Sequence, residues 1–306
     1  MNAVSCFNDR CQRAMPHFAA ASTAFAACLL ASLPALAAIA PNLGSTRTYA
    51  VVSDTFSNIN NVAPPPNITA LNGTAGLPVL CFTTPPAAAP LTIVGTTVTP
   101  CPPQVGTDQG LALAFLNAQA LAVSCTLIPA GPPMDAVIIP GHPPGFFPPG
   151  CYRFGGAVNI TVGTSVTLDG QGVYIFSSVG GLNTGADSRV NLINGACASD
   201  VFWAPGGATT IGAFTIGGIP AAVPTFVGNI IQTTAITIGN FANVTGRALA
   251  FPSTVTTDAD TITVPTCAAF ALGVTGGVPT LSEWSMILLS ILLAVAGFVT
   301  MRRQVR

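Results

Sequence analysis

The residues whose types and spacing suggest chemistry are threonines that alternate with aliphatic residues in short segments of the C-terminal half. Side chains two apart on a β-strand project to one face about 6.5–7 Å apart, and neighbouring strands repeat at about 4.7–4.9 Å. The β-branch restricts χ1 of threonine, so its methyl and hydroxyl groups are presented with little entropy left to lose. If the aliphatic residues point inward, these threonines form an outward lattice that suits contact with a repeating surface, although threonine is also common on any solvated strand. The candidates are Thr161, Thr167, Thr237, Thr254, Thr256, Thr261 and Thr263.

Residues for catalysis are scattered. The aspartates of the C-terminal half are mostly isolated in Gly or Asn contexts typical of turns, so the paired carboxylates of a glycosidase are not apparent. His142 lies in a Pro-rich loop with no nucleophile pattern near it. Trp203 is expected in the core rather than as a sugar-stacking platform, and Arg153 and Arg247 are expected to pair with aspartates across the fold. The sequence therefore predicts no enzyme, no metal site and no cofactor.

The composition points to an exported β protein. Only 6% of the 306 residues are charged, and no Lys is present, whereas about a quarter of an ordinary domain is charged. The 31 Gly and 27 Pro residues favour turns and strands over helices. The net charge of -1 and the scattered Arg residues provide no basic stripe, so nucleic acid is not an expected partner.

Residues 1–37 have the pattern of a secretory signal peptide. Arg10, Arg13 and His17 precede an apolar stretch over 18–36, and Ala35-Leu36-Ala37 forms an A-x-A cleavage pattern. The alternative is a first transmembrane helix. The small-residue site and the polar, Pro-containing stretch that follows it favour removal by signal peptidase.

Residues 278–306 form a second targeting segment. An apolar run over 285–301 falls within the range of about 17–25 residues of a membrane-spanning helix, and the following Arg302, Arg303 and Arg306 predict a cytoplasmic end. The segment resembles the IPTL-CTERM sorting signal of Gram-negative bacteria, with mild departures at Val278 and Ser285. The resemblance implies an exosortase-type enzyme, transient anchoring in the inner membrane, and then release or transfer to the cell surface. The sorting motif comprises Val278, Pro279, Thr280, Leu281, Ser282, Glu283 and Trp284.

The cysteines agree with export. None that remains after signal removal belongs to a C-x-x-C pair, so zinc is not expected. An oxidising compartment permits disulfides, although sequence alone does not resolve their connectivity and free thiols are the alternative. The cysteines concerned are Cys81, Cys101, Cys125, Cys151, Cys197 and Cys267.

Residues 41–277 are expected to form one all-β domain with a helix over about 108–125. Thr107 or Asp108 could cap this helix, and its stripe of Leu111, Phe115, Ala118, Leu121, Ala122 and Cys125 is expected to pack on the β core. After it, short alternating strands fit either a sandwich or a solenoid, and their shortness and Gly corners favour the solenoid. The strands are expected at 158–162, 165–168, 173–176, 189–193, 201–203, 225–231, 235–238, 244–250 and 261–264.

A series of motifs in the region 149–264 resembles the DUF3494 family of microbial ice-binding proteins. The motifs include Pro149-Gly150-Cys151-Tyr152-Arg153-Phe154, Thr167-Leu168-Asp169-Gly170, Asp200-Val201-Phe202-Trp203 and Val244-Thr245-Gly246-Arg247-Ala248-Leu249-Ala250, in family order. The resemblance implies a discontinuous, irregular β-solenoid of triangular cross-section with one long helix packed alongside. It also implies adsorption to ice through a flat face. An insertion at 211–224 departs from the family pattern and leaves the local strand register open.

These observations predict a secreted or surface-delivered protein that adsorbs to the surface of an ice crystal through its threonines and inhibits ice growth or recrystallisation. The alternative is a cell-surface adhesin or extracellular matrix protein without ice activity, because a sorting tail alone indicates only delivery. A solenoid enzyme acting on polysaccharide is a third possibility, which would require a convergent acidic cleft.

Overall fold

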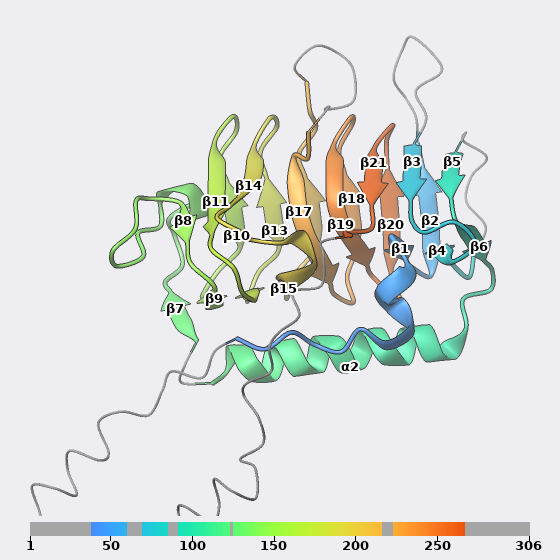
Figure 1. Ribbon diagram of the computed structural model, residues 1–306, viewed down its shortest axis with the longest axis horizontal. Helices are drawn as coiled ribbons and strands as arrows, with labels where there is room; N and C mark the ends of the chain where they lie inside the picture. Colours follow the sequence, from blue (N-terminus) through green and yellow to red (C-terminus); the bar gives the residue numbers. More distant parts are fainter. Residues whose placement is uncertain (1–37, 60–68, 85–90, 123–124, 216–222, 267–306) are drawn as a thin grey trace, which may run out of the picture.

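A computed structural model describes residues 38–59, 69–84, 91–122, 125–215 and 223–266. Within these residues the chain forms three parallel sheets and an α-helix that runs along the long axis of the molecule (Figure 1). The expected mostly-β fold with a helix alongside is therefore confirmed. The expected signal helix, sorting motif and transmembrane helix lie outside the described residues, and no helix among the described residues is long and apolar enough to cross a membrane.

The parallel strands arise from coils that visit the sheets in turn. One coil runs through β9 (Gly150–Phe154), β10 (Val158–Ile160) and β11 (Ser165–Asp169), and the next through β12 (Tyr174–Ser178), β13 (Leu182–Thr184) and β14 (Arg189–Ile193). Sheet A contains β1 (Val51–Val52), β3 (Thr69–Asn72), β4 (Pro78–Cys81), β5 (Leu91–Val94), β6 (Thr96–Val98), β7 (Thr126–Ile128), β9 (Gly150–Phe154), β12 (Tyr174–Ser178), β15 (Val201–Pro205), β17 (Phe226–Ile231), β19 (Asn243–Leu249) and β21 (Thr261–Thr263). Sheet B contains, in spatial order, β10 (Val158–Ile160), β13 (Leu182–Thr184), β16 (Thr209–Ile211), β18 (Ile236–Ile238), β20 (Thr254–Thr257) and β2 (Thr55–Asn58). Sheet C contains β14 (Arg189–Ile193), β11 (Ser165–Asp169) and β8 (Phe146–Phe147). Three short 3-10 helices among the described residues are η1 (Gly44–Thr48), η2 (Met134–Ala136) and η3 (Ala198–Asp200).

The N-terminal strands stack on the last coils of the chain. Val51 of β1 pairs with Ala248 of β19, and β2 and β3 pair in parallel with β20 and β21. The solenoid is therefore built from two parts of the chain that are far apart in sequence.

The core contains aromatic rings stacked from coil to coil. The ring centroid of Trp203 lies 4.4 Å from that of Phe176 and 5.2 Å from that of Phe226. Its indole N–H donates to the carbonyl of Val227 at 2.9 Å, so the buried polar group is satisfied. The expected core position of Trp203 is confirmed.

Each of the nine expected strand ranges overlaps a strand, namely β10, β11, β12, β14, β15, β17, β18, β19 and β21. Six other strands that the structure describes after the helix lie outside these ranges, namely β7, β8, β9, β13, β16 and β20. Strands β16 and β17 flank the inserted region, and residues 216–222 within it lie outside the described part of the chain.

The helix differs from the expected one in both its bounds and its buried face. Helix α2 spans Pro103–Ala120, with Pro102 at the N-cap and Pro103 at the first helical position, where its fixed φ suits a helix start. The buried side chains are Val105, Gln109, Ala112, Leu116 and Ala120. The expected stripe was wrong: its members Leu111, Phe115, Ala118, Leu121 and Ala122 are exposed. Both faces of the helix carry apolar residues at helical spacing, so periodicity could not select the inner one.

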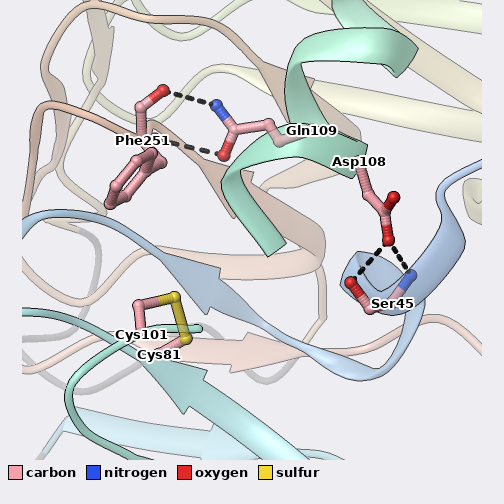
Figure 2. Close-up of a disulfide and its surroundings, with 6 residues drawn as sticks. All are labelled: Ser45, Cys81, Cys101, Asp108, Gln109 and Phe251. Carbon is pink, nitrogen blue, oxygen red and sulfur yellow. Dashed lines mark hydrogen bonds between the residues drawn. A yellow bond between two sulfur atoms is a disulfide. The ribbon is translucent and has the colours of Figure 1, made fainter. Parts of the chain in front are cut away.

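The expected N-cap residues have other roles. Thr107 Oγ1 donates to the carbonyl of Pro103 inside the helix, at 3.1 Å. Asp108 accepts from the backbone N–H and hydroxyl of Ser45 at 2.7 and 2.6 Å (Figure 2). Asp108 thus holds η1 against the first turns of α2.

Disulfides tie both ends of the helix to the β body. Cys101, just before α2, bonds to Cys81 of β4 (Figure 2), and Cys125, after α2, bonds to Cys151 of β9. Cys197 is also disulfide-bonded, whereas Cys267 lies outside the described residues. The expectation of disulfides is confirmed.

Among the described residues, an asparagine and a backbone carbonyl hold Arg247, rather than the aspartate that the sequence suggested. Its guanidinium is buried and donates to Asn229 Oδ1 at 2.6 Å and to the carbonyl of Arg47. Burial lowers the pKa of Arg247 to about 10. Neutral oxygen acceptors therefore hold this cation and join β19 to η1.

Candidate functional site

The outer face of sheet B carries one row of side chains in continuous register. One outward residue of each strand pairs with one of the next strand across all six strands. The row is Asn159, Asn183, Thr210, Thr237, Thr256 and Ser57. Because parallel strands repeat at about 4.7–4.9 Å, the row is a ladder of short polar groups along the solenoid axis.

A second pair of side chains widens this row at one end. Thr254 of β20 pairs with Thr55 of β2, two residues before Thr256 and Ser57. These four side chains form a small two-dimensional lattice with about 6.5–7 Å between rows. We call the eight outward residues of sheet B, from both rows, the B-face.

The B-face contains amide and hydroxyl side chains and no charged group. Asn183 Nδ2 donates to Asn159 Oδ1 at 3.2 Å, which orients both amides. Between the outward residues, the side chains of Val158, Ile211 and Ile236 are buried in the core. A threonine anchored in this way presents its methyl and hydroxyl groups with little remaining freedom.

The corners of sheet B hold adjacent coils close together. At Gly212 a Cβ atom would lie only 2.3 Å from the carbonyl oxygen of Gly185, so a side chain there would force the coils apart. At the other corner, buried Gln232 accepts from Thr209 Oγ1 at 2.7 Å and donates to the carbonyl of Ala235 at 2.8 Å. The carbonyl of Gln232 in turn accepts from Gln109 of α2 at 2.8 Å. The B-face is therefore supported by the same polar network that holds the helix.

The structure distributes the threonines singled out in the sequence over several surfaces. Thr237, Thr254 and Thr256 lie on the B-face. Thr161 is exposed just after β10, and its backbone N–H donates to Asp135 Oδ1 at 2.9 Å.

The remaining candidates lie on other sheets. Thr167 lies on sheet C in register with Asn191. Thr261 and Thr263 lie on β21 of sheet A, where Thr263 Oγ1 accepts from Asn72 Nδ2 at 3.3 Å. Three of the seven candidates thus share the B-face, three lie on other sheets, and Thr161 lies just beyond the end of β10.

Sequence reasoning missed the B-face residues Asn159, Asn183, Thr210, Ser57 and Thr55. Asn159 and Thr210 stand between inward-facing residues in short alternating segments, as the selected threonines do. A search for any small polar residue in this setting, rather than for threonine alone, would have found them.

Two carboxyls with a raised pKa lie off the B-face. Burial raises the pKa of Asp260 well above its usual range, while backbone N–H groups of Asp258 and Ala242 donate to it and oppose the shift. Burial also raises the pKa of Asp200, and a hydrogen bond from Ser199 lowers it. The contact from Ala242 joins Asp260 to a neighbouring coil, as in a structural carboxyl, and the other two contacts are with residues close in sequence. No cluster of three or more His, Cys, Asp or Glu residues in the described ranges is placed to hold a metal ion.

The fold and the B-face define the class of protein. It is a parallel β-solenoid of irregular coils, with a helix packed along it and one exposed sheet face that carries no charge. A family model described as Ice-binding-like matches residues 86–263, more than half of the chain, so the chain belongs to this family. A second model, the IPTL-CTERM motif, matches residues 277–303. Both resemblances drawn from the sequence are confirmed.

Curated relatives share part of the chain. An ice-binding protein of Flavobacterium frigoris (strain PS1) is 32% identical over 117 residues, which cover 38% of this chain and 39% of the relative. Ice-binding protein 1 of Shewanella frigidimarina (strain NCIMB 400) is 37% identical over 119 residues, which cover 37% of this chain and 12% of the relative. The chain thus spans less than half of the length of these relatives.

Solved structures cover more of the fold. The ice-binding protein of the Antarctic ascomycete Antarctomyces psychrotrophicus superposes with a TM-score of 0.56 at 23% identity, over 75% of this chain and 100% of that one. The DUF3494 domain of Shewanella frigidimarina ice-binding protein 1 gives 0.55 at 22% identity, over 76% of this chain and 100% of that one. At these identities the likeness shows the fold.

Proposed function

We propose that this protein is exported and adsorbs to ice through the B-face, where it inhibits ice growth or recrystallisation. The observation that supports this most directly is the six-residue row in register across sheet B, which is uncharged and exposed on one side. The family and the names of the relatives support ice as the partner.

The physical basis is a match between two repeating surfaces. Hydroxyl and amide groups can take the place of water molecules at the crystal surface, while the threonine methyl groups order water between them. Because the strands are packed on a rigid core, little side-chain entropy is lost on adsorption. Between adsorbed molecules the ice front must bulge, and a curved front is less stable than a flat one.

A pair of matched variants tests the choice of face. Thr237→Tyr places a large ring at the centre of the B-face row, whereas Thr167→Tyr places the same ring on sheet C. We expect the purified, oxidised protein to inhibit ice recrystallisation, the first variant to lose this activity and the second to keep it. Activity that survives in the Thr237 variant but fails in the Thr167 variant would move the site to sheet C. Thr161, Thr261 and Thr263 remain candidate contacts on their own surfaces.

A correctly folded parent protein without ice activity would favour the alternative function. The protein would then be a surface adhesin or matrix component, for which the sorting motif provides delivery but no ligand.

We also propose the route of export. Residues 1–37 serve as a signal peptide removed by signal peptidase, and 285–301 anchor the precursor in the inner membrane of a Gram-negative bacterium. An exosortase-type enzyme then acts at the motif that begins with Val278 and releases the domain or transfers it to the cell surface. The IPTL-CTERM match over 277–303 supports this sequence of events. Mass spectrometry of the protein from the cell surface or medium should find a first residue near Ala38 and no residues from 285–301, and a product that retains 285–301 would contradict it.

A further inference from the structure

The outer face of α2 is apolar although no described part of the chain covers it. Its exposed apolar residues are Leu111, Ala114, Phe115, Ala118, Leu121 and Ala122, which we call the outer helix face, and the uncharged Gln104, Thr107 and Asn117 are exposed beside them. Leu111 is 63% exposed, Phe115 40% and Leu121 70%. A helix that is apolar on both faces is typically covered on both, so this surface is suited to an apolar contact.

Charge is absent from this surface. Asp108 is the one charged residue within Pro103–Ala120, and its carboxylate is already engaged by Ser45 and by Gln104 Nε2 at 2.6 Å. An uncharged surface can enter an apolar environment without desolvating an ion. It also has no means of attracting anionic headgroups, so any lipid contact would depend on apolar burial alone.

The chain beyond the described residues brings a bilayer within reach. Residues 267–284 connect the domain to the apolar run at 285–301, and these eighteen residues span at most roughly 60 Å when extended. The motif matched over 277–303 is a membrane-anchored sorting signal. Because the C-terminal segment already holds the chain at the membrane, contact between the outer helix face and the bilayer is intramolecular. Even a weakly binding apolar surface is then mostly bound.

A second copy of the chain is a poorer occupant. The outer helix face covers residues 111–122, which is about 18 Å of chain about 10 Å wide, or a footprint of about 180 Å². This footprint is well below the roughly 800 Å² that each partner of a stable pair buries. The packing of α2 on sheet A also keeps bilayer contact separate from the B-face, because α2 contacts β9, β12, β15 and β17.

We propose that the outer helix face rests on the bilayer that holds the C-terminal segment, so that the anchored precursor lies on the membrane through α2. This inference rests on the proposed export route and is independent of ice binding.

The test uses the full chain reconstituted in phosphatidylcholine vesicles whose acyl chains carry bromine, which quenches nearby indoles. Phe115→Trp places an indole on the outer helix face, and Ser165→Trp places one at an exposed position of sheet C as the matched control. Fluorescence of each variant is compared with that of the parent, in which Trp284 reports insertion of the tail and Trp203 reports the core.

We expect the added indole at position 115 to be quenched and blue-shifted, equally at low and high salt, and the one at 165 to remain unquenched. Adding Leu111→Glu and Leu121→Glu to the Phe115 variant should lower the membrane-contacting fraction at least about tenfold. Both leucines are largely exposed, so disulfides, circular dichroism and ice activity should be unchanged.

Other outcomes overturn the proposal. An indole at 115 that remains unquenched and accessible to aqueous acrylamide, while Trp284 is quenched, shows a tethered domain that does not touch the bilayer. An indole shielded from acrylamide but not quenched by lipid indicates a second copy on this face. An unquenched Trp284 overturns the anchoring itself, and this inference with it, without bearing on ice adsorption.

Discussion

The side-chain amide of Gln109 is hydrogen-bonded at both ends to the backbone of Phe251. Gln109 Nε2 donates to the carbonyl of Phe251 at 2.9 Å, and the N–H of Phe251 donates to Gln109 Oε1 at 3.1 Å (Figure 2). The same Nε2 also donates to the carbonyl of Gln232 at 2.8 Å. One buried side chain on the helix therefore satisfies three backbone groups in two different coils.

Replacing this side chain should destabilise the fold. Gln109→Leu leaves two carbonyls and one N–H without their partner, and we expect the free energy of unfolding to fall by about 2–4 kcal/mol. Denaturant unfolding followed by circular dichroism measures the change. Gln119 is a matched control, because its amide makes the same paired contact with the backbone of Ile39 at 2.7 and 2.9 Å near the surface. Gln119→Leu should cost less than about 1 kcal/mol, and equal costs would show that burial of the network is unimportant.

The disulfide after the helix should contribute strongly to stability. It joins Cys125 to Cys151 across 26 residues of sequence, and a crosslink of this size typically contributes about 2–4 kcal/mol. Cys125→Ser combined with Cys151→Ser should lower Tm and the free energy of unfolding by a corresponding amount. Differential scanning calorimetry under non-reducing conditions provides the measurement. An unchanged Tm would mean that packing alone holds this end of the helix.

Asp260 should make the stability depend on pH. Because burial raises its pKa in the folded chain, the folded state retains a proton that the unfolded state releases above about pH 3.9. Its stabilising contribution is complete below that pH and is lost as the pH rises through the folded pKa. Asp260→Asn removes the titration, so the difference in unfolding free energy between parent and variant should change steadily between acidic and neutral pH. Parallel pH profiles would show that Asp260 does not titrate differently in the two states.

The absence of charge on the B-face should be essential for its activity. Asn183→Asp preserves the size of the side chain but adds a strongly hydrated carboxylate, whose desolvation opposes adsorption. We expect the concentration needed to inhibit ice recrystallisation to rise about tenfold or more at neutral pH. Lowering the pH below about 3.9 should restore activity as the carboxyl becomes neutral. Asn191→Asp on sheet C is the matched control and should behave like the parent at both pH values.

The strands could be predicted because alternation is a local property. Val158, Ile160 and the intervening Asn159 show inward and outward positions without knowledge of any partner strand. Strands such as β13 were not predicted, because a strand of three residues that follows Gly180 and Gly181 shows little alternation in its sequence.

The sheet to which each strand belongs could not be predicted. Thr167 and Thr237 have similar neighbours in the sequence, yet pairing with Asn191 places one on sheet C and pairing with Thr210 places the other on sheet B. That choice depends on contacts between coils and on corners such as Gly212. The buried face of α2 was not predicted correctly for a related reason. Leu111 and Leu116 are equally apolar, and only the packing of the helix on sheet A determines which of them is buried.

The pairing of the first strands with the last ones also governs when the protein can fold. A repeat solenoid can nucleate at any coil and propagate along the chain. Strands β1 and β3 can pair with the nearby β4 and β5, but their second partners, β19 and β21, and the partner of β2, β20, come last in the chain. Closing so long a loop slows folding, so the N-terminal coils can dock on the rest of the solenoid only after β21 is available. A chain with this topology therefore completes its structure only when nearly all of the domain has been synthesised.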